Sequence, residues 1–114
     1  MADRNGIKKA FVSAIGALCR AEISAFDQAT HEYHSIRIEE PVEIASIQGN
    51  ISIYGGRPFV HAHVVLANGE GRTMAGHLVG GTIFAAELYM QELLGLNLVR
   101  TPDSVTGLNL WTVE

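Results

Sequence analysis

The stretch from Phe59 to Gly81 constrains the fold of this chain more than any other, because two apolar runs flank a turn signal. From Val60 to Leu66 apolar residues recur at every second position on one side, the pattern of a half-buried β-strand. Asn68-Gly69-Glu70-Gly71 supplies the residues that a tight reversal needs, because Gly and Asn tolerate positive φ. The returning run from Thr73 to Val79 is again short and apolar. The sequence therefore predicts a β-hairpin.

Three histidines lie on this hairpin. His61 and His63 share one face of the first strand, and His77 lies on the return strand. A loop formed by Gly69-Glu70-Gly71 opposes His63 and His77 directly, whereas a loop centred on Gly69 opposes His61 and His77. Directly paired Cβ atoms lie about 4.5–5.5 Å apart, and positions two apart on one strand lie about 7 Å apart. Both registers bring the three imidazoles close enough to hold one ion or one small anion.

This histidine pattern predicts a site for a divalent ion, with Zn²⁺ as the first choice. Neutral imidazole is a preferred ligand of Zn²⁺, and three protein ligands, here His61, His63 and His77, leave one coordination position open. The alternative is that these histidines are polar positions on the solvated face of a sheet. His31 and His34 precede a strand at loop spacing, so we expect them at the surface.

Composition and charge narrow the class of protein. With 114 residues, of which 47% are hydrophobic, we expect one globular domain over residues 1–114, because a second core is unusual below about 150 residues. No apolar run approaches the roughly 18 residues of a membrane span, and Met1 to Asn5 lacks the features of a secretion signal. A cytoplasmic protein without a membrane partner is therefore expected. The net charge of −4 and the scattered arginines predict that any DNA binding is weak.

Catalytic signatures are sparse. The single cysteine, Cys19, lies in an apolar run and is expected to be a small buried residue without a role. No Gly-x-Ser-x-Gly elbow and no Walker glycine loop occurs. Gly55-Gly56-Arg57-Pro58 matches part of the core of an AT-hook, but the leading arginine is missing, and Pro58 runs straight into a strand. We therefore expect a turn here rather than a DNA-binding hook.

Further strands are predicted along the rest of the chain. Gly6 reads as a glycine C-cap at the end of a helix that is nearly absent, and Gly16 marks a bulge or a close backbone approach. Between Thr82 and Leu94 helix-forming residues without clean alternation predict a helix from local signals alone. The expected strands are Ile7–Leu18, Arg20–Phe26, Tyr33–Glu39, Val42–Ile53 as two short strands or one bent strand, Leu98–Arg100 and Leu108–Thr112.

Several stretches together resemble the PPC domain, the "plants and prokaryotes conserved" domain, to which DNA binding has often been attributed. They cover nearly the whole chain. The matching stretches are Ser13-Ala14-Ile15-Gly16-Ala17-Leu18, Glu43-Ile44-Ala45-Ser46-Ile47-Gln48-Gly49-Asn50, His61-Ala62-His63 with the Asn68-Gly69 turn, Gly76-His77-Leu78, Glu87, and Arg100 with Asp103 and Thr106-Gly107-Leu108.

The resemblance implies an α+β fold, mainly antiparallel β-sheet with a flanking helix, assembled as a homotrimer. It also implies a strand around Glu87, in place of the helix that local propensity favours. Similar domains begin with a strand and most of a helix before the equivalent of Asn5-Gly6-Ile7. We therefore expect a shortened N-terminal strand and helix, and an exposed sheet edge.

The function that the resemblance implies is binding. In plants the domain accompanies AT-hooks, which bind DNA, while the domain itself looks like an assembly and partner-binding module. Stand-alone members carry the His-x-His and Gly-His-Leu motifs, which implies that His61, His63 and His77 form a metal or small-ligand site. We expect a trimeric binding or regulatory module. The alternatives are a DNA-binding protein and an unrecognised metal-dependent enzyme, the less favoured reading, for which Glu87 is the matching family carboxylate.

Overall fold

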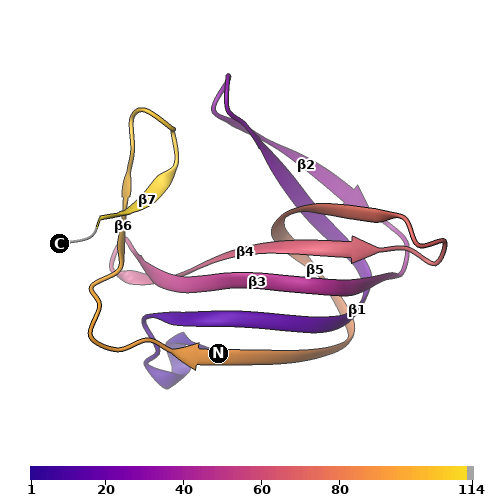
Figure 1. Ribbon diagram of the computed structural model, residues 1–114, viewed down its shortest axis with the longest axis horizontal. Helices are drawn as coiled ribbons and strands as arrows, with labels where there is room; N and C mark the ends of the chain where they lie inside the picture. Colours follow the sequence, from indigo (N-terminus) through magenta and orange to yellow (C-terminus); the bar gives the residue numbers. More distant parts are fainter. Residues whose placement is uncertain (113–114) are drawn as a thin grey trace.

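The computed structural model describes residues 1–112 and consists almost entirely of β-strands (Figure 1). The one helical segment in this range is the 3₁₀ turn η1 (Asp3–Asn5). The strands are β1 (Ala10–Asp27), β2 (Glu32–Ile38), β3 (Val42–Tyr54), β4 (Arg57–Ala67), β5 (Thr73–Glu92), β6 (Val99–Pro102) and β7 (Asn109–Thr112).

The expected α+β class with a flanking helix is wrong. Gly6 ends η1 at φ 67°, and its N–H donates to the carbonyl of Asp3 at 3.2 Å, so the predicted glycine C-cap is confirmed. The helix before it, however, has three residues, too few to fold as an independent helix or to flank a sheet. Every longer segment of the described chain is a strand or the connection between two strands.

The local prediction of a helix over residues 82–94 is also wrong, whereas the strand that the family resemblance implies around Glu87 is confirmed. Residues 82–92 of this segment form the second half of β5, which pairs with β1 from Ala10 opposite Glu92 to Ser24 opposite His77. Pairing with β1 satisfies backbone N–H and C=O groups along β5 and thereby overrides the helix propensity of its residues.

β1 is the central strand of the sheet. Its first half lies between β3 and β5, and its second half lies between β2 and β5. Figure 1 shows β5 curving from its place beside β4 to its place beside β1. The strand order is β2-β1-β5-β4-β3-β6-β7, and an additional pairing joins β1 to β3. The pairings of β1, β3, β4 and β5 therefore form a closed circuit, which bends the sheet around its core.

The larger core cluster lies on the inner face of this circuit. Ala62, Val64 and Leu66 are buried on β4, as the alternation in the sequence predicts, and Leu66 and Val64 are 0% and 1% exposed. Fully burying an aliphatic side chain of this size contributes about 1.5–3 kcal/mol, so this face fixes the register of β4. The other buried members of the cluster are Leu18, Ala21, Ile23, Ile38, Val42 and Ile44.

Two glycines allow strands to approach one another closely. Gly16 has φ 148°, and a Cβ there would lie 2.2 Å from the carbonyl oxygen of Ala85. The register of β1 against β3 shifts between Ala14 and Gly16, so the predicted bulge is confirmed. At Gly49 on β3, a Cβ would lie 2.3 Å from the carbonyl oxygen of His61. Glycine at this position lets β3 support the strand that carries two of the histidines.

β1 is longer than the sequence predicts, because it is continuous across the two runs expected at residues 7–18 and 20–26. β3 is continuous through Gly49, so of the two alternatives for residues 42–53 the single strand is confirmed. Gly55 and Gly56, at φ 59° and 78°, form the tight loop between β3 and β4, so the turn expected at this glycine pair is confirmed. No helix within residues 1–112 has the length and apolar character needed to cross a membrane.

Candidate metal centre

The β4–β5 hairpin sets the relative positions of the three histidines. His61 and His63 lie on β4, and His77 lies on β5 directly opposite His63, so the observed register is the one with the loop at Gly69-Glu70-Gly71. Asn68 organises this loop, because its Oδ1 accepts hydrogen bonds from the backbone N–H groups of Glu70 (3.0 Å) and Arg72 (2.9 Å). The loop chemistry therefore determines which histidines meet.

The three imidazoles form one cluster. The ring centroids lie 4.5 Å apart for His63 and His77, 5.0 Å for His61 and His63, and 5.3 Å for His61 and His77. One ring nitrogen from each residue lies within 4.8 Å of the other two. Because Zn–N bonds are about 2.0–2.1 Å long, two nitrogens on one tetrahedral ion lie about 3.4 Å apart. The rings would turn toward one another to share an ion, and the donor set of three imidazoles fits Zn²⁺.

Partial burial keeps two of these histidines in the neutral form that a metal requires. Burial is the first cause that lowers the pKa of His61 below its ordinary value, followed by the positive charge of Arg100. Burial also lowers the pKa of His77, with a smaller contribution from His63. A neutral imidazole has a nitrogen lone pair that can bind a metal ion without first losing a proton.

A buried cation, Arg100 on β6, lies beside the cluster. Arg100 is 8% exposed, and its Nη2 lies 3.5 Å from Nδ1 of His61. Burial lowers its pKa, but a guanidinium is not deprotonated in proteins, so Arg100 stays charged. Its hydrogen bonds go to neutral acceptors, from Nε to Ser52 Oγ (2.9 Å), from Nη1 to the carbonyl oxygen of Asn109 (2.9 Å) and from Nη2 to Asn50 Oδ1 (2.7 Å).

Aromatic rings complete the surroundings of Arg100. The ring centroids of Trp111 and Phe59 lie 5.1 and 5.7 Å from its Cζ, within the range of a cation–π contact. Trp111 Nε1 donates to the same Ser52 hydroxyl as Arg100, at 2.9 Å. Arg100 is one of the residues that carry the family resemblance, but its role could not be read from the sequence, because Ser52 and Asn50 are distant along the chain. The one local signal is an arginine directly after the apolar pair Leu98-Val99.

A cavity of about 380 Å³ opens in front of the three histidines and Arg100. The edge of the Tyr33 ring faces His77 at a centroid distance of 5.5 Å, and Phe26 packs against Tyr33 at 4.9 Å. The cavity is therefore polar at the histidines and at Arg100, and it has an aromatic wall at Phe26 and Tyr33. Its other lining residues are Gln28, Phe59, Leu108, Asn109 and Leu110.

Comparison with known proteins identifies the family. Residues 1–94 match the Plants and Prokaryotes Conserved (PCC) domain. The chain belongs to this family. The resemblance in the sequence is thereby confirmed, and the fold described above is that of a PCC domain.

Solved structures of related proteins have the same fold. A plant- and prokaryote-conserved (PPC) protein from Pyrococcus horikoshii is 41% identical, with a TM-score of 0.93 over 97% of this chain and 77% of that one. A protein from Archaeoglobus fulgidus described as metal-containing is 40% identical, with a TM-score of 0.93 over 97% and 79%. A protein from Bacteroides thetaiotaomicron for which DNA binding has been suggested is 25% identical, with a TM-score of 0.90 over 98% and 78%.

The chain spans a small part of the curated relatives that it matches. Two proteins from Synechococcus strains, both called bifunctional protein GlmU, are 34% and 29% identical over 98 and 110 residues. These matches cover 84% and 94% of this chain but 14% and 16% of those proteins.

The other residues considered in the sequence lie outside the histidine cluster of this PCC domain. Glu87 lies opposite Ile15 on β1, ten positions along β5 from His77, and lines a different hollow. His31 and His34 are exposed at the β1–β2 end, as expected. Cys19 is exposed rather than buried. The register of β1 against β5 shifts on both sides of Leu18, so Leu18 points inward and Cys19 outward.

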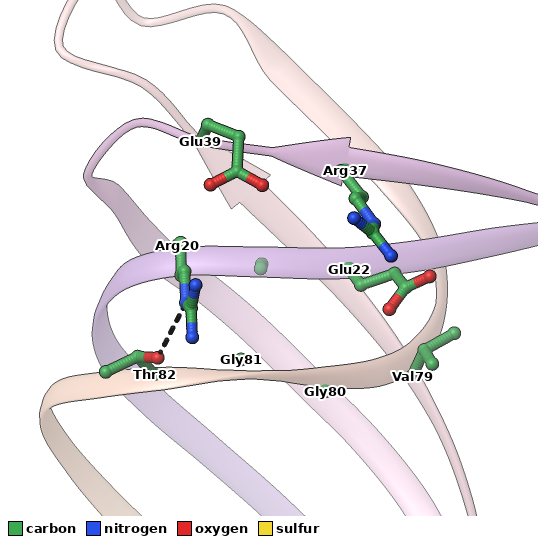
Figure 2. A pocket seen from close by; sticks show the side chains of 9 residues that line it. Arg20, Glu22, Arg37, Glu39, Val79, Gly80, Gly81 and Thr82 are labelled. Carbon is green, nitrogen blue, oxygen red and sulfur yellow. Dashed lines mark hydrogen bonds between the residues drawn. The ribbon is translucent and has the colours of Figure 1, made fainter.

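A second hollow of about 350 Å³ lies between β1, β2 and β5 (Figure 2). Arg20 reaches across it, and its Nε donates to Thr82 Oγ1 at 3.1 Å. Glu22, Arg37 and Glu39 also line this hollow. Because it contains two arginines and two carboxylates, its formal charges balance, in contrast to the surroundings of Arg100.

Acidification is expected to destabilise the metal-free protein. His61 and His77 have pKa values below the ordinary value of about 6.5. Between these lower values and about pH 6.5, the unfolded chain binds protons that the folded chain does not, so the free energy of unfolding falls as the pH falls. Above this window both imidazoles are neutral in the folded and the unfolded chain, so this destabilisation is absent. Urea denaturation at several pH values measures the free energy of unfolding.

A double variant and a single variant provide the comparison. The pH dependence should be shallower for His61→Gln/His77→Gln and unchanged for Gln28→Ala, which alters a cavity residue that has no titratable group. Hydrogen bonds from Thr30 and from Thr106 lower the pKa values of Asp27 and Asp103, but these carboxyls titrate below about pH 4 and leave the window clear. Equal slopes for the parent and the double variant would contradict the assignment.

Proposed function

We propose that this PCC domain is a trimeric binding or regulatory module. We further propose that His61, His63 and His77 bind one divalent metal ion, with Zn²⁺ as the first choice. One observation carries the proposal: each histidine offers a nitrogen within 4.8 Å of the other two. The description of the Archaeoglobus relative as metal-containing supports it. A bound Zn²⁺ would supply a Lewis acid with one open coordination position.

The residues of the chain position this site without a flexible loop. The pleat of β4 directs His61 and His63 to the same face, and the cross-strand pair of His63 and His77 holds the third ligand. All three lie on paired strands, and Asn50 and Gln48 of β3 lie opposite His61 and His63. Ligands on paired strands are more firmly placed than ligands on loops.

Binding ranks above catalysis in this proposal. A reaction at the metal would need a general acid or base beside the open position. Glu87, the carboxylate that the family resemblance suggests, lines another hollow together with Ile15 and Tyr89. The proposal therefore gives Glu87 no part in the site.

The second half of β5 supports the proposed assembly. Ile83, Phe84, Leu88 and Tyr89 are 65%, 78%, 51% and 59% exposed, and neighbouring positions point to opposite faces, so both faces of this half are apolar. β1 pairs with one edge, and within residues 1–112 no strand pairs with the other. Exposed apolar strands with an unpaired edge associate with further chains. We propose that other copies of this chain cover them, in the homotrimer that the family resemblance implies.

DNA binding is the second candidate, because it has been suggested for the Bacteroides relative. Affinity for duplex DNA depends mainly on neutralising phosphates with Lys and Arg. The chain has eight such residues against twelve Asp and Glu, and a net charge of −4. We therefore propose that DNA is at most a weak ligand that is not read in a sequence-specific way.

The metal site predicts the effect of His63→Ala on zinc affinity. Removing one of three ligands should weaken Zn²⁺ binding more than the roughly 10–100-fold that the loss of an outer-shell partner costs. Calorimetry on protein without an affinity tag measures this, and His34→Ala serves as the control because His34 lies outside the cluster. Equal zinc affinity in His63→Ala and the parent, or no zinc binding by the parent, would refute the site.

The assembly predicts a mass in solution of three times the 12.3 kDa of one chain. Phe84→Arg should shift the protein toward monomer, because it places a charge on the proposed interface, while Val105→Arg should not. Val105 is a matched control, since it is 81% exposed and lies in the β6–β7 loop. Light scattering at micromolar concentration measures the mass, and a monodisperse monomer of the parent would contradict the trimer.

The charge of the chain predicts a dissociation constant for duplex DNA no tighter than about 10⁻⁶ M at physiological salt. Fluorescence anisotropy with labelled duplexes of several sequences at about 150 mM salt measures it. Binding in the nanomolar range to one of these sequences would show that the domain is a DNA-binding protein.

A further inference from the structure

Arg100 is a buried cation with no carboxylate partner in the described part of the chain. Ion pairs within residues 1–112 involve Arg57, Arg72 and His34, but not Arg100. Arg100 is 8% exposed, and its hydrogen-bond acceptors are a hydroxyl, an amide oxygen and a backbone carbonyl. Buried charges in proteins are almost always paired. A guanidinium held by neutral groups at the wall of a cavity is therefore suited to a negative ligand.

The histidine cluster adds to this imbalance. Its members are three imidazoles, and no Asp, Glu or Cys completes the group among residues 1–112. Neutral imidazoles do not offset the charge of a divalent ion, so the ion and Arg100 would present positive charge to the same cavity. The three histidines and Arg100 line the same cavity of about 380 Å³, and Nη2 of Arg100 lies 3.5 Å from Nδ1 of His61. Charges interact strongly where water is partly excluded.

Arg100 has more N–H donors than its hydrogen bonds within the chain use. A guanidinium has five N–H groups, and three donate to Ser52, Asn109 and Asn50. Of the other two, the group on Nη2 lies toward Nδ1 of His61 at 3.5 Å, which leaves the second N–H group of Nη1, and Arg100 is among the residues that line the cavity. The chain therefore retains a donor of the type that binds a carboxylate or a phosphate oxygen.

The rest of the cavity wall is mainly apolar and partly aromatic, with polar side chains at Gln28 and Asn109. Phe26 and Tyr33 pack together beside His77, and Phe59 packs against Arg100. The volume of about 380 Å³ lies within the range of small-molecule sites, roughly 300–1,000 Å³. A ligand that fills this space has an apolar body next to its charged group.

We infer that the site takes a small organic anion, with its anionic headgroup between the histidine cluster and Arg100 and its apolar body against Phe26, Tyr33 and Phe59. The inference rests on the proposed metal site, which supplies the open coordination position. It adds the ligand class and makes Arg100 the residue that selects for negative charge. The balanced hollow of Figure 2 provides no such selection.

Three probe molecules separate the parts of this inference. Benzoate has the charge and the apolar body, benzamide has nearly the same shape without the charge, and acetate has the charge without the body. Calorimetry on untagged, zinc-loaded protein should show benzoate binding at least about tenfold tighter than either of the others, the value of one charge-assisted contact or one buried apolar group. The zinc content of each sample is measured before and after titration.

Variants of Arg100 test its role. Arg100→Gln should weaken benzoate binding at least about tenfold while the zinc content stays unchanged, and Arg100→Lys should recover part of the loss because it keeps the charge. Arg72→Gln, at an exposed arginine in the β4–β5 loop, should change neither. If Arg100→Gln does not fold, the three probes on the parent still decide the charge preference.

The outcomes for the metal and for the anion are distinguishable. If the parent binds zinc but binds benzoate no tighter than benzamide, the ligand class is wrong and the metal site stands. If folded Arg100→Gln binds benzoate as the parent does, Arg100 does not select the ligand. If the parent binds no zinc, the proposed function fails. The probes are then applied to the metal-free protein, where a benzoate preference lost in Arg100→Gln supports the anion site and equal binding overturns it.

Discussion

The register of the β4–β5 hairpin is the constraint on which the site depends. His77 lies where β5 changes partner, with His63 opposite it on β4 and Ser24 opposite it on β1. A slip of one residue would turn His77 to the face on which Val64 and Leu66 are buried. The cost of burying an imidazole without a partner excludes this slip, so the same apolar contacts that stabilise the fold also align the ligands.

The β6–β7 hairpin gives the site its charge. One pair, Ile53 opposite Val99, joins β6 to β3, and Arg100 follows directly after that pair. Its guanidinium then bonds to Ser52 and Asn50 of β3 and to the backbone of β7. A single side chain thus links the main sheet, the terminal hairpin and the histidine cluster. The chemistry of the cavity depends on this hairpin as much as on the histidines.

Local patterns predicted the hairpin, its loop and the shared face of His61 and His63, because alternation and turn residues act over a few positions. They failed where distant pairing decides the outcome. Residues 82–94 have helix propensity but are strand, because β1 pairs along them. Cys19 is exposed because β1 has irregularities on both sides of Leu18. The surroundings of Arg100 combine β7 with β3 and β4, which lie far from Arg100 along the chain, so no short stretch of sequence could reveal them.

The long pairing between β1 and β5 also affects how the chain reaches its native state. Ala10 pairs with Glu92, near the opposite end of the described residues. During synthesis, β1 can pair with β2 and β3 long before β5 emerges, and its remaining edge stays open until β5 has been synthesised. The entropy cost of closing so long a loop comes before the β1–β5 contacts that offset it can form. Topologies of this kind have high contact order and fold slowly, so the strand at the centre of the finished sheet is among the last to be completed.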